Sequence, residues 1–153
     1  MKHESGRSMI EMLGVLAIMG VITAGAILLI SSAMRTQKRN TVNEEVLQIV
    51  MGVRQLLGEY DDFSNINNSI FSAIGMSSKN TYGGTYEIAV DPSNSRQFVV
   101  SVTGLSQTDC EYFATKAWSD SVGYMNSDGK QSGATGSCNL GNGKNIVKIT
   151  YGE

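Results

Sequence analysis

Residues 6–34 read GRSMIEMLGVLAIMGVITAGAILLISSAM, and this stretch decides the fold of the 153-residue chain. The 23 residues from Met12 to Met34 carry no charge. At about 1.5 Å of rise per residue, a helix of this length spans roughly 34 Å, which exceeds the roughly 30 Å hydrocarbon core of a bilayer. We therefore expect one membrane-spanning helix near the N-terminus and a more polar globular region after it.

Glu11 is the unusual residue of this stretch, because it places a carboxylate at the head of the apolar run. A charged group inside a membrane costs about 2.5–3.5 kcal/mol at mid-helix, and such groups usually have a specific partner. A cleaved secretory signal has a shorter apolar run, of about 7–15 residues. Two further alternatives are a simple signal anchor and a Glu11 side chain that only reaches the lipid headgroups. None of the three alternatives gives the Glu11 carboxylate a specific partner.

The composition argues against an enzyme. The chain has 12 Lys+Arg and 14 Asp+Glu, a formal net charge of −2, so it offers no broad basic surface to a nucleic acid. Its one His is His3, and its two Cys are Cys110 and Cys138. These residues are too few for a zinc site, and they leave a nucleophile without an imidazole base. We expect no catalytic residue, no cofactor, no metal and no nucleic acid partner.

The charges that flank the span do not fix its orientation. Lys2 and Arg7 precede the span, whereas Arg35, Lys38 and Arg39 follow it. Taken alone, the positive-inside rule favours the cytoplasm for the second group. We interpret that second group as a contact with lipid headgroups.

Past the span, the helical pattern continues. Apolar residues at steps of three and four predict one uninterrupted helix from Ser8 to about Tyr60, and no proline breaks it. We expect residues 35–60 to pack on the core of the globular region through this amphipathic stripe. The stripe consists of Val42, Val46, Ile49, Val50, Val53, Leu56, Leu57 and Tyr60.

The remaining sequence predicts a mixed region of strands and short helices. A run of alternating or β-branched residues marks each strand, and clusters of Asp, Asn, Ser and Gly mark the connections. The expected elements are a polar connector over 61–68, a helical turn over 70–74, a hairpin of strands 85–90 and 97–102, a helix from Gln107 to about Trp118 with Ser106 and Asp109 at its N-cap, an exposed loop over 127–145, and a strand over 146–151.

The segment Gly6-Arg7-Ser8-Met9-Ile10-Glu11, followed by the apolar run, resembles the processing site of type IV prepilins and the related pseudopilins. In that family a prepilin peptidase cuts after a Gly, and the Glu five residues beyond the cut is the signature acid. The resemblance implies cleavage between Gly6 and Arg7, with Glu11 as the assembly acid. The first residue after the cut is usually apolar and N-methylated in the family, whereas Arg7 is a long cation.

The resemblance also implies an α+β pilin fold, in which a long N-terminal helix packs on an antiparallel β-sheet head. It divides the chain into a leader (1–6), a transmembrane and assembly half of the helix (7–34), an amphipathic half (35–60) and a head (61–153). Cleavage would create an amine at Arg7 that can meet Glu11 of an adjacent copy. Because an unpaired charge in an apolar bundle costs several kcal/mol, such a pair would fix the register between neighbouring helices.

Cys110 and Cys138 most simply form a disulfide if the head is exported. In the chain-entropy model, closing this loop stabilises the fold by about 3.6 kcal/mol. Two free thiols in a cytosolic domain are the alternative. The stretch 98–117, with Gly104-Leu105-Ser106-Gln107 leading to Cys110, resembles the head of type IVb pilins, the toxin-coregulated and conjugative class. In that class a C-terminal disulfide encloses a variable, exposed region, here 110–138. The six-residue leader departs from the class, whose leader is usually longer.

The expected function is therefore a structural subunit of a type IV pilus. The prepilin would wait in the inner membrane with its N-terminus in the cytoplasm, and prepilin peptidase would process it. The inner-membrane assembly machinery would then add it to further copies of itself in an extracellular filament. One alternative within the family is a minor pilin or a type II secretion pseudopilin. An alternative from another class is a membrane-anchored extracytoplasmic binding module in which Glu11 is incidental.

Overall fold

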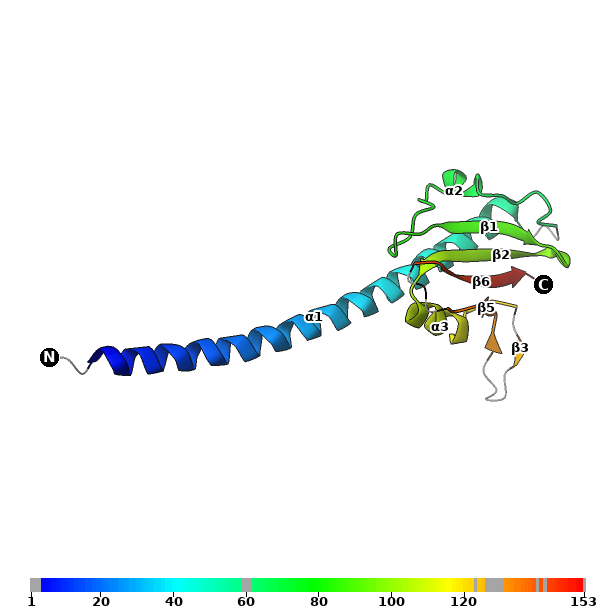
Figure 1. Ribbon diagram of the computed structural model, residues 1–153. Coiled ribbons are helices and arrows are strands. Elements are labelled where there is room, and N and C mark those ends of the chain that lie inside the picture. Colours follow the sequence, from blue (N-terminus) through cyan, green and yellow to red (C-terminus); the bar gives the residue numbers. More distant parts are fainter. Residues whose placement is uncertain are drawn as a thin grey trace. The chain divides into compact units, whose positions relative to one another are not determined.

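The structure is a computed structural model that describes residues 4–58, 62–122, 124–125, 131–139, 141 and 143–152. It has the α+β architecture expected from the sequence, a long N-terminal helix followed by an antiparallel sheet (Figure 1). By its internal contacts the chain forms two compact units, Met1–Lys38 and Arg39–Glu153. The elements in chain order are α1 (Glu4–Leu57), α2 (Ile70–Ala73), β1 (Tyr86–Asp91), β2 (Asn94–Leu105), α3 (Gln107–Thr115), β3 (Tyr124–Met125), β4 (Gln131–Ser132), β5 (Ala134–Gly136) and β6 (Asn145–Gly152).

Helix α1 is continuous through both the apolar and the amphipathic sequence, as the periodicity predicts. It begins at Glu4, inside the expected leader, and ends at Leu57. Gly58 follows with a φ of 64°, a left-handed conformation that glycine adopts readily and that commonly ends a helix. The expected end near Tyr60 lies outside the described residues.

The main sheet has the strand order β1-β2-β6-β5, and each neighbouring pair is antiparallel. The hairpin expected between the first two strands is confirmed, with Asp91 opposite Asn94 across a two-residue turn. The backbone N–H of Ser93 donates to the Asp91 carboxylate at 2.8 Å, which favours that turn. Strand β2 is longer at both ends than the predicted 97–102.

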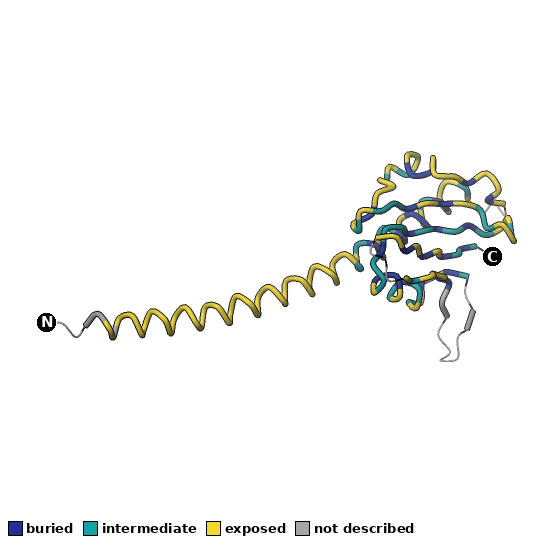
Figure 2. Tube along the Cα trace, in the orientation of Figure 1, coloured by how far each residue is buried: buried dark blue, intermediate teal, exposed yellow. Residues whose placement is uncertain are grey.

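The core lies between one face of this sheet and the part of α1 that belongs to the second unit. A row of buried residues crosses the four strands in register, consisting of Ile88, Val100, Ile149 and Ala134. Most of the predicted α1 stripe packs in the same core, namely Val42, Val46, Ile49, Val50 and Val53 (Figure 2). The prediction of the stripe is wrong for Leu56, which is 49% exposed, whereas Leu57 is partly buried against the core.

Two expectations for the C-terminal half are wrong. The segment 127–145 is not one exposed loop, because it contains β4 and β5, and Ala134 is buried. Pairing with β6, not an apolar pattern of its own, holds β5 in place. Residues 126–130, 140 and 142 of this segment lie outside the described residues. Helix α3 ends at Thr115, because the backbone of Lys116 is extended. Trp118 folds back beyond it, and its indole N–H donates to the Phe113 carbonyl at 3.0 Å.

Candidate functional site

The first candidate surface is the apolar part of α1 in the first unit. Its described large hydrophobic residues are all exposed, from 53% at Val15 to 75% at Val21. Figure 2 shows this part of α1 in the colour of exposed residues. By length and composition this helix is able to cross a membrane. An uninterrupted apolar surface of this kind marks contact with lipid or with other protein. Its members are Met9, Ile10, Met12, Leu13, Val15, Leu16, Ile18, Met19, Val21, Ile22, Ile27, Leu28, Leu29, Ile30 and Met34.

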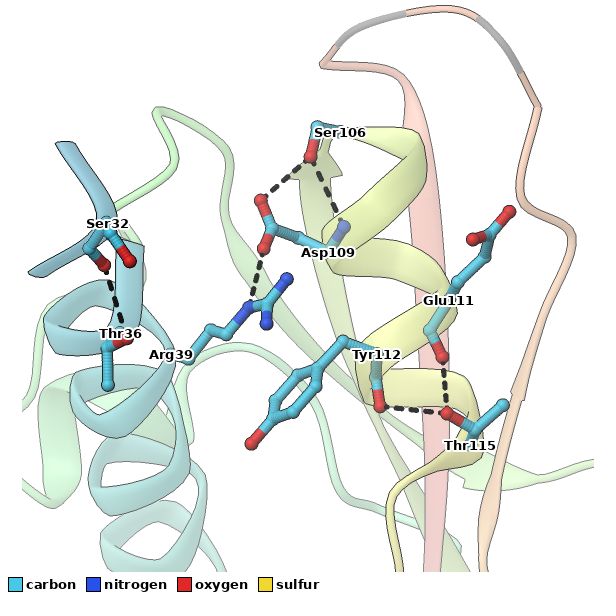
Figure 3. A network of polar contacts seen from close by, with 8 residues as sticks. All are labelled: Ser32, Thr36, Arg39, Ser106, Asp109, Glu111, Tyr112 and Thr115. Carbon is cyan, nitrogen blue, oxygen red and sulfur yellow. Dashed lines mark hydrogen bonds and ion pairs between the residues drawn. The ribbon is translucent and has the colours of Figure 1, made fainter. Parts of the chain in front are cut away.

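Hydroxyl groups along this unit bond to the backbone of α1. Thr23 and Ser31 donate to carbonyls four and three residues earlier, at 2.7 and 2.8 Å. Just beyond the apolar run, Thr36 donates to the Ser32 carbonyl at 3.2 Å (Figure 3). Such bonds let a hydroxyl enter an apolar environment without an unsatisfied donor.

Three glycines of this helix have no neighbour in the described chain that would require the absence of a side chain. A Cβ placed at Gly14, Gly20 or Gly25 would have no heavy atom within 4 Å. In apolar surroundings, small residues allow the backbones of neighbouring helices to approach closely. The glycines therefore leave room for partners outside the chain.

The residues of the expected processing site all lie in the first turns of α1. Gly6 and Glu11 are exposed, and Glu11 forms no ion pair with any side chain that the structure describes. The backbone of Arg7 is helical, and its side chain lies outside the described part of the chain. Four residues of helix separate Arg7 from Glu11, about 6 Å along the axis.

The second candidate region is the disulfide-bounded segment of the head. Cys110 on α3 is bonded to Cys138 after β5, with 5.6 Å between their Cα atoms and a sequence separation of 28. Cys110 is fully buried in the core and Cys138 is partly buried against it, so the bond ties the end of the segment to the interior. The bond encloses β3, β4 and β5.

Next to this disulfide lies a polar network that the sequence did not reveal. The Arg39 Nε donates to an Asp109 oxygen at 2.8 Å, and the Arg39 guanidinium carbon lies 4.2 Å from the centre of the Tyr112 ring (Figure 3). The other Asp109 oxygen accepts from the Ser106 hydroxyl at 2.7 Å. Ser106 also accepts from the Asp109 backbone N–H at 3.3 Å, which confirms it as the N-cap of α3.

This network corrects two interpretations. We expected Arg39 to face lipid headgroups, but its guanidinium is held between two side chains of α3. We expected Asp109 only as the acidic member of a capping motif, but it also binds Arg39, 70 residues earlier in the chain. The capping motif Ser106-x-x-Asp109 could be predicted from the sequence. The contact between Arg39 and Asp109 could not, because no local sequence pattern indicates contacts between residues so far apart.

Two tyrosines of the head, buried Tyr86 and partly buried Tyr82, interact with polar residues of α1. Burial raises the pKa of Tyr82 to about 12, and the negative charge of Asp109 adds to this shift. The Tyr86 hydroxyl donates to the Glu45 carboxylate, and burial followed by this hydrogen bond raises the pKa of Tyr86. Tyr86 and Glu45 thus form a second polar link from α1 to the head.

Comparison with known proteins gives one informative match. No family model matches the chain. The chain is similar to the toxin coregulated pilin of Vibrio cholerae serotype O1, with 29% identity over an alignment of 128 residues that covers 73% of this chain. The match spans 57% of that pilin, less than two thirds of its length. The chain is thus homologous to a type IVb pilin, and it combines the exposed apolar helix with the antiparallel head of a pilin-like α+β fold.

Proposed function

We propose that this chain is a structural subunit of a type IV pilus and assembles through the apolar part of α1. The observation that carries the proposal is a helix with fifteen exposed large apolar side chains and a carboxylate, Glu11, at its head. A membrane anchor explains the apolar side chains but not the acid. A helix that moves from lipid into a bundle of identical helices explains both.

The energetics favour a filament that is stable outside the membrane. Each large apolar side chain taken from water contributes about 1.5–3 kcal/mol. The apolar side chains surround α1 and do not form a single stripe, so several neighbouring helices can cover them. Contacts between different surfaces of successive copies do not close on themselves, and they produce a helical filament.

The proposed processing step supplies the partner of Glu11. Cleavage after Gly6 would free an α-amino group at Arg7, about one helical turn from the acid. In the filament this amine would meet Glu11 of an adjacent copy, because two unpaired charges in an apolar bundle cost several kcal/mol. The pair would set the axial position of each subunit relative to its neighbour.

The proposed partners follow from this sequence of events. Before assembly, α1 would cross the inner membrane with residues 1–6 in the cytoplasm, where prepilin peptidase removes them. The inner-membrane assembly machinery would then transfer the subunit to the growing fibre. The resemblance of residues 6–11 to prepilins and the similarity to toxin coregulated pilin support this order.

The experiment that tests the proposal is mass spectrometry of the protein purified from the outer surface of the producing cells. We expect a mature chain that begins at Arg7, with or without an added methyl group, recovered in long fibres. An intact Met1, or a cut at another bond, would contradict processing at Gly6. Processing without fibres would favour a minor pilin or a pseudopilin.

A further inference from the structure

Large apolar side chains are exposed at only two places in the described part of the second unit. Met51 and Leu56 are 65% and 49% exposed near the end of α1, and Ile146 is 42% exposed on β6. All other strongly exposed large hydrophobic residues of the described chain belong to the apolar part of α1. A head that is otherwise polar thus has two separate apolar patches.

The first patch is a groove between α1 and α2, here named the α1–α2 groove. At this groove Ile74 packs directly on α1 at Gly52, because a Cβ at Gly52 would lie 2.7 Å from the Ile74 Cγ2. Among the residues that the structure describes, no charged side chain lines it. The lining residues are Gln48, Met51, Gly52, Gln55, Leu56, Ala73, Ile74 and Met76.

The second patch, here named the Ile146 patch, lies on the outer face of the sheet. Ile146 is exposed between buried Asn145 and buried Val147, so it points away from the core. Lys144 and Lys148 are exposed on either side of it, because residues two apart on a strand share a face. These residues border a shallow hollow with Thr135 and Ser137, and no acidic side chain of the described part of the chain lines that hollow.

The two patches are complementary in charge. Glu44 is exposed on α1 one turn before Gln48, so it extends the groove with a negative charge. The only cation of α1 near the groove, Arg54, is directed to Asp120, with 3.5 Å between their charged groups. The Ile146 patch presents two lysines. An apolar contact between the patches would therefore bring opposite charges together at its edge.

The two patches also lie on different sides of the sheet. Helix α1 packs against the inner face, which carries the buried side chains of β6, whereas Ile146 is on the outer face. In a symmetric dimer, a single partner therefore cannot cover both patches of one copy. Docking one patch on the other leaves a free patch at each end, which is the condition for an open array.

We propose that the α1–α2 groove of one copy receives the Ile146 patch of the next copy. This inference rests on the proposed function, since it names the head contact of the same filament. In this contact Ile146 enters the groove between Met51 and Ile74, while Lys144 and Lys148 lie near Glu44. The head then contributes its own directional contact to the filament, in addition to the contacts of α1.

A cysteine pair tests the contact in fibres made by cells that express the full chain. We expect Met51→Cys combined with Ile146→Cys to give a ladder of disulfide-linked multimers, at least about tenfold above either single variant. The matched control combines Met51→Cys with Ala89→Cys. Ala89 is exposed on the same outer face but two strands away, too far for a disulfide in the proposed contact.

A charge exchange tests the same contact without new cysteines. Glu44→Lys alone and Lys148→Glu alone should each lower the fibre yield about fivefold, because each creates like-charge neighbours. The double variant should restore it. Fibres without a specific ladder and without restoration would overturn the proposed contact and leave the proposed function intact. Failure of the unaltered chain to form any fibre would instead overturn the proposed function.

Discussion

Arg39 links α1 to the disulfide-bounded part of the head through a single side chain. Both groups that hold it, the Asp109 carboxylate and the Tyr112 ring, lie on α3. The side chains of Arg39 and Asp109 are only 21% and 9% exposed, so the two charges are largely removed from water. Breaking such a pair costs more than the pair itself contributes, because the remaining charge stays buried without a partner.

We therefore predict that Arg39→Gln lowers the free energy of unfolding of the full chain in detergent by about 3 kcal/mol. The matched control is Arg54→Gln. Its pair with Asp120 joins side chains that are 46% and 72% exposed, so its loss should cost less than about 0.5 kcal/mol. Equal effects of the two substitutions in a denaturant titration would contradict this account of Arg39.

A second prediction at the residue scale concerns alkaline pH. The pKa of Tyr82 is raised from 10.0 to about 12 in the folded chain, and the pKa of Tyr151 is raised as well, chiefly by burial. A group whose pKa is higher in the folded state stabilises the fold below its unfolded pKa. Stability should therefore be constant up to about pH 10 and should fall as the pH rises toward about 12.

Unfolding measured at several pH values, with tyrosinate absorbance recorded in parallel, checks this prediction. In the Tyr82→Phe variant the loss of stability above about pH 10 should be smaller, because one of the shifted groups is gone. Ionisation of Tyr82 near its ordinary pKa, with the head still folded, would show that this side chain is not buried as described.

At the scale of elements, the strongest periodic patterns were the ones that sequence alone could identify. The steps of three and four in α1 and the alternation of Val147, Ile149 and Tyr151 in β6 each reflect one buried face of a regular element. The hairpin between β1 and β2 was readable from its turn residues. These features are local, so a short window of sequence contains all the information needed.

The elements that sequence missed depend on distant parts of the chain. Strand β5 is three residues long, and it forms because its backbone pairs with β6. The predicted stripe of α1 wrongly includes Leu56, which is exposed although the next residue, Leu57, packs against the core, and only the complete fold shows which of the two leucines faces the core. The Arg39–Asp109 pair also joins residues that only the complete fold brings together.

The disulfide gives a prediction for the region it encloses. Replacing Cys110 and Cys138 together by Ser should lower the free energy of unfolding by about 3–4 kcal/mol, because the unfolded chain regains the freedom of a long loop. Denaturant titration of the oxidised and reduced chain and of the double variant would measure this loss. Unchanged stability after reduction would mean that the hydrogen bonds of β5 and β6 hold the region without the bond.

At the scale of the whole molecule, the two units present surfaces of different kinds. The apolar part of α1 is exposed on every side, whereas the described residues of the head form a closed core and a polar surface with two small apolar patches. The first unit therefore needs lipid or other copies around it. The head needs neither for its own core. This difference between the two units agrees with a subunit that first lies in a membrane and then polymerises.

We predict that Glu11→Ala leaves the amount of subunit in the membrane unchanged and reduces fibres at least about tenfold. Removal of the acid makes insertion in lipid easier, but it leaves the amine of the neighbouring copy unpaired in the bundle. The control is Glu87→Ala, which removes an exposed acid of β1 and should leave both quantities unchanged. Electron microscopy of the cell surface and quantification of the membrane fraction provide the two readouts.

The most direct test of the central claim is a density map of the assembled fibre at a resolution that shows side chains. The account predicts that the Glu11 carboxylate lies within hydrogen-bonding distance of the α-amino group of Arg7 in an adjacent subunit, inside a bundle of α1 helices. A Glu11 side chain that faces solvent or lipid, with no cation of another copy near it, would contradict the claim.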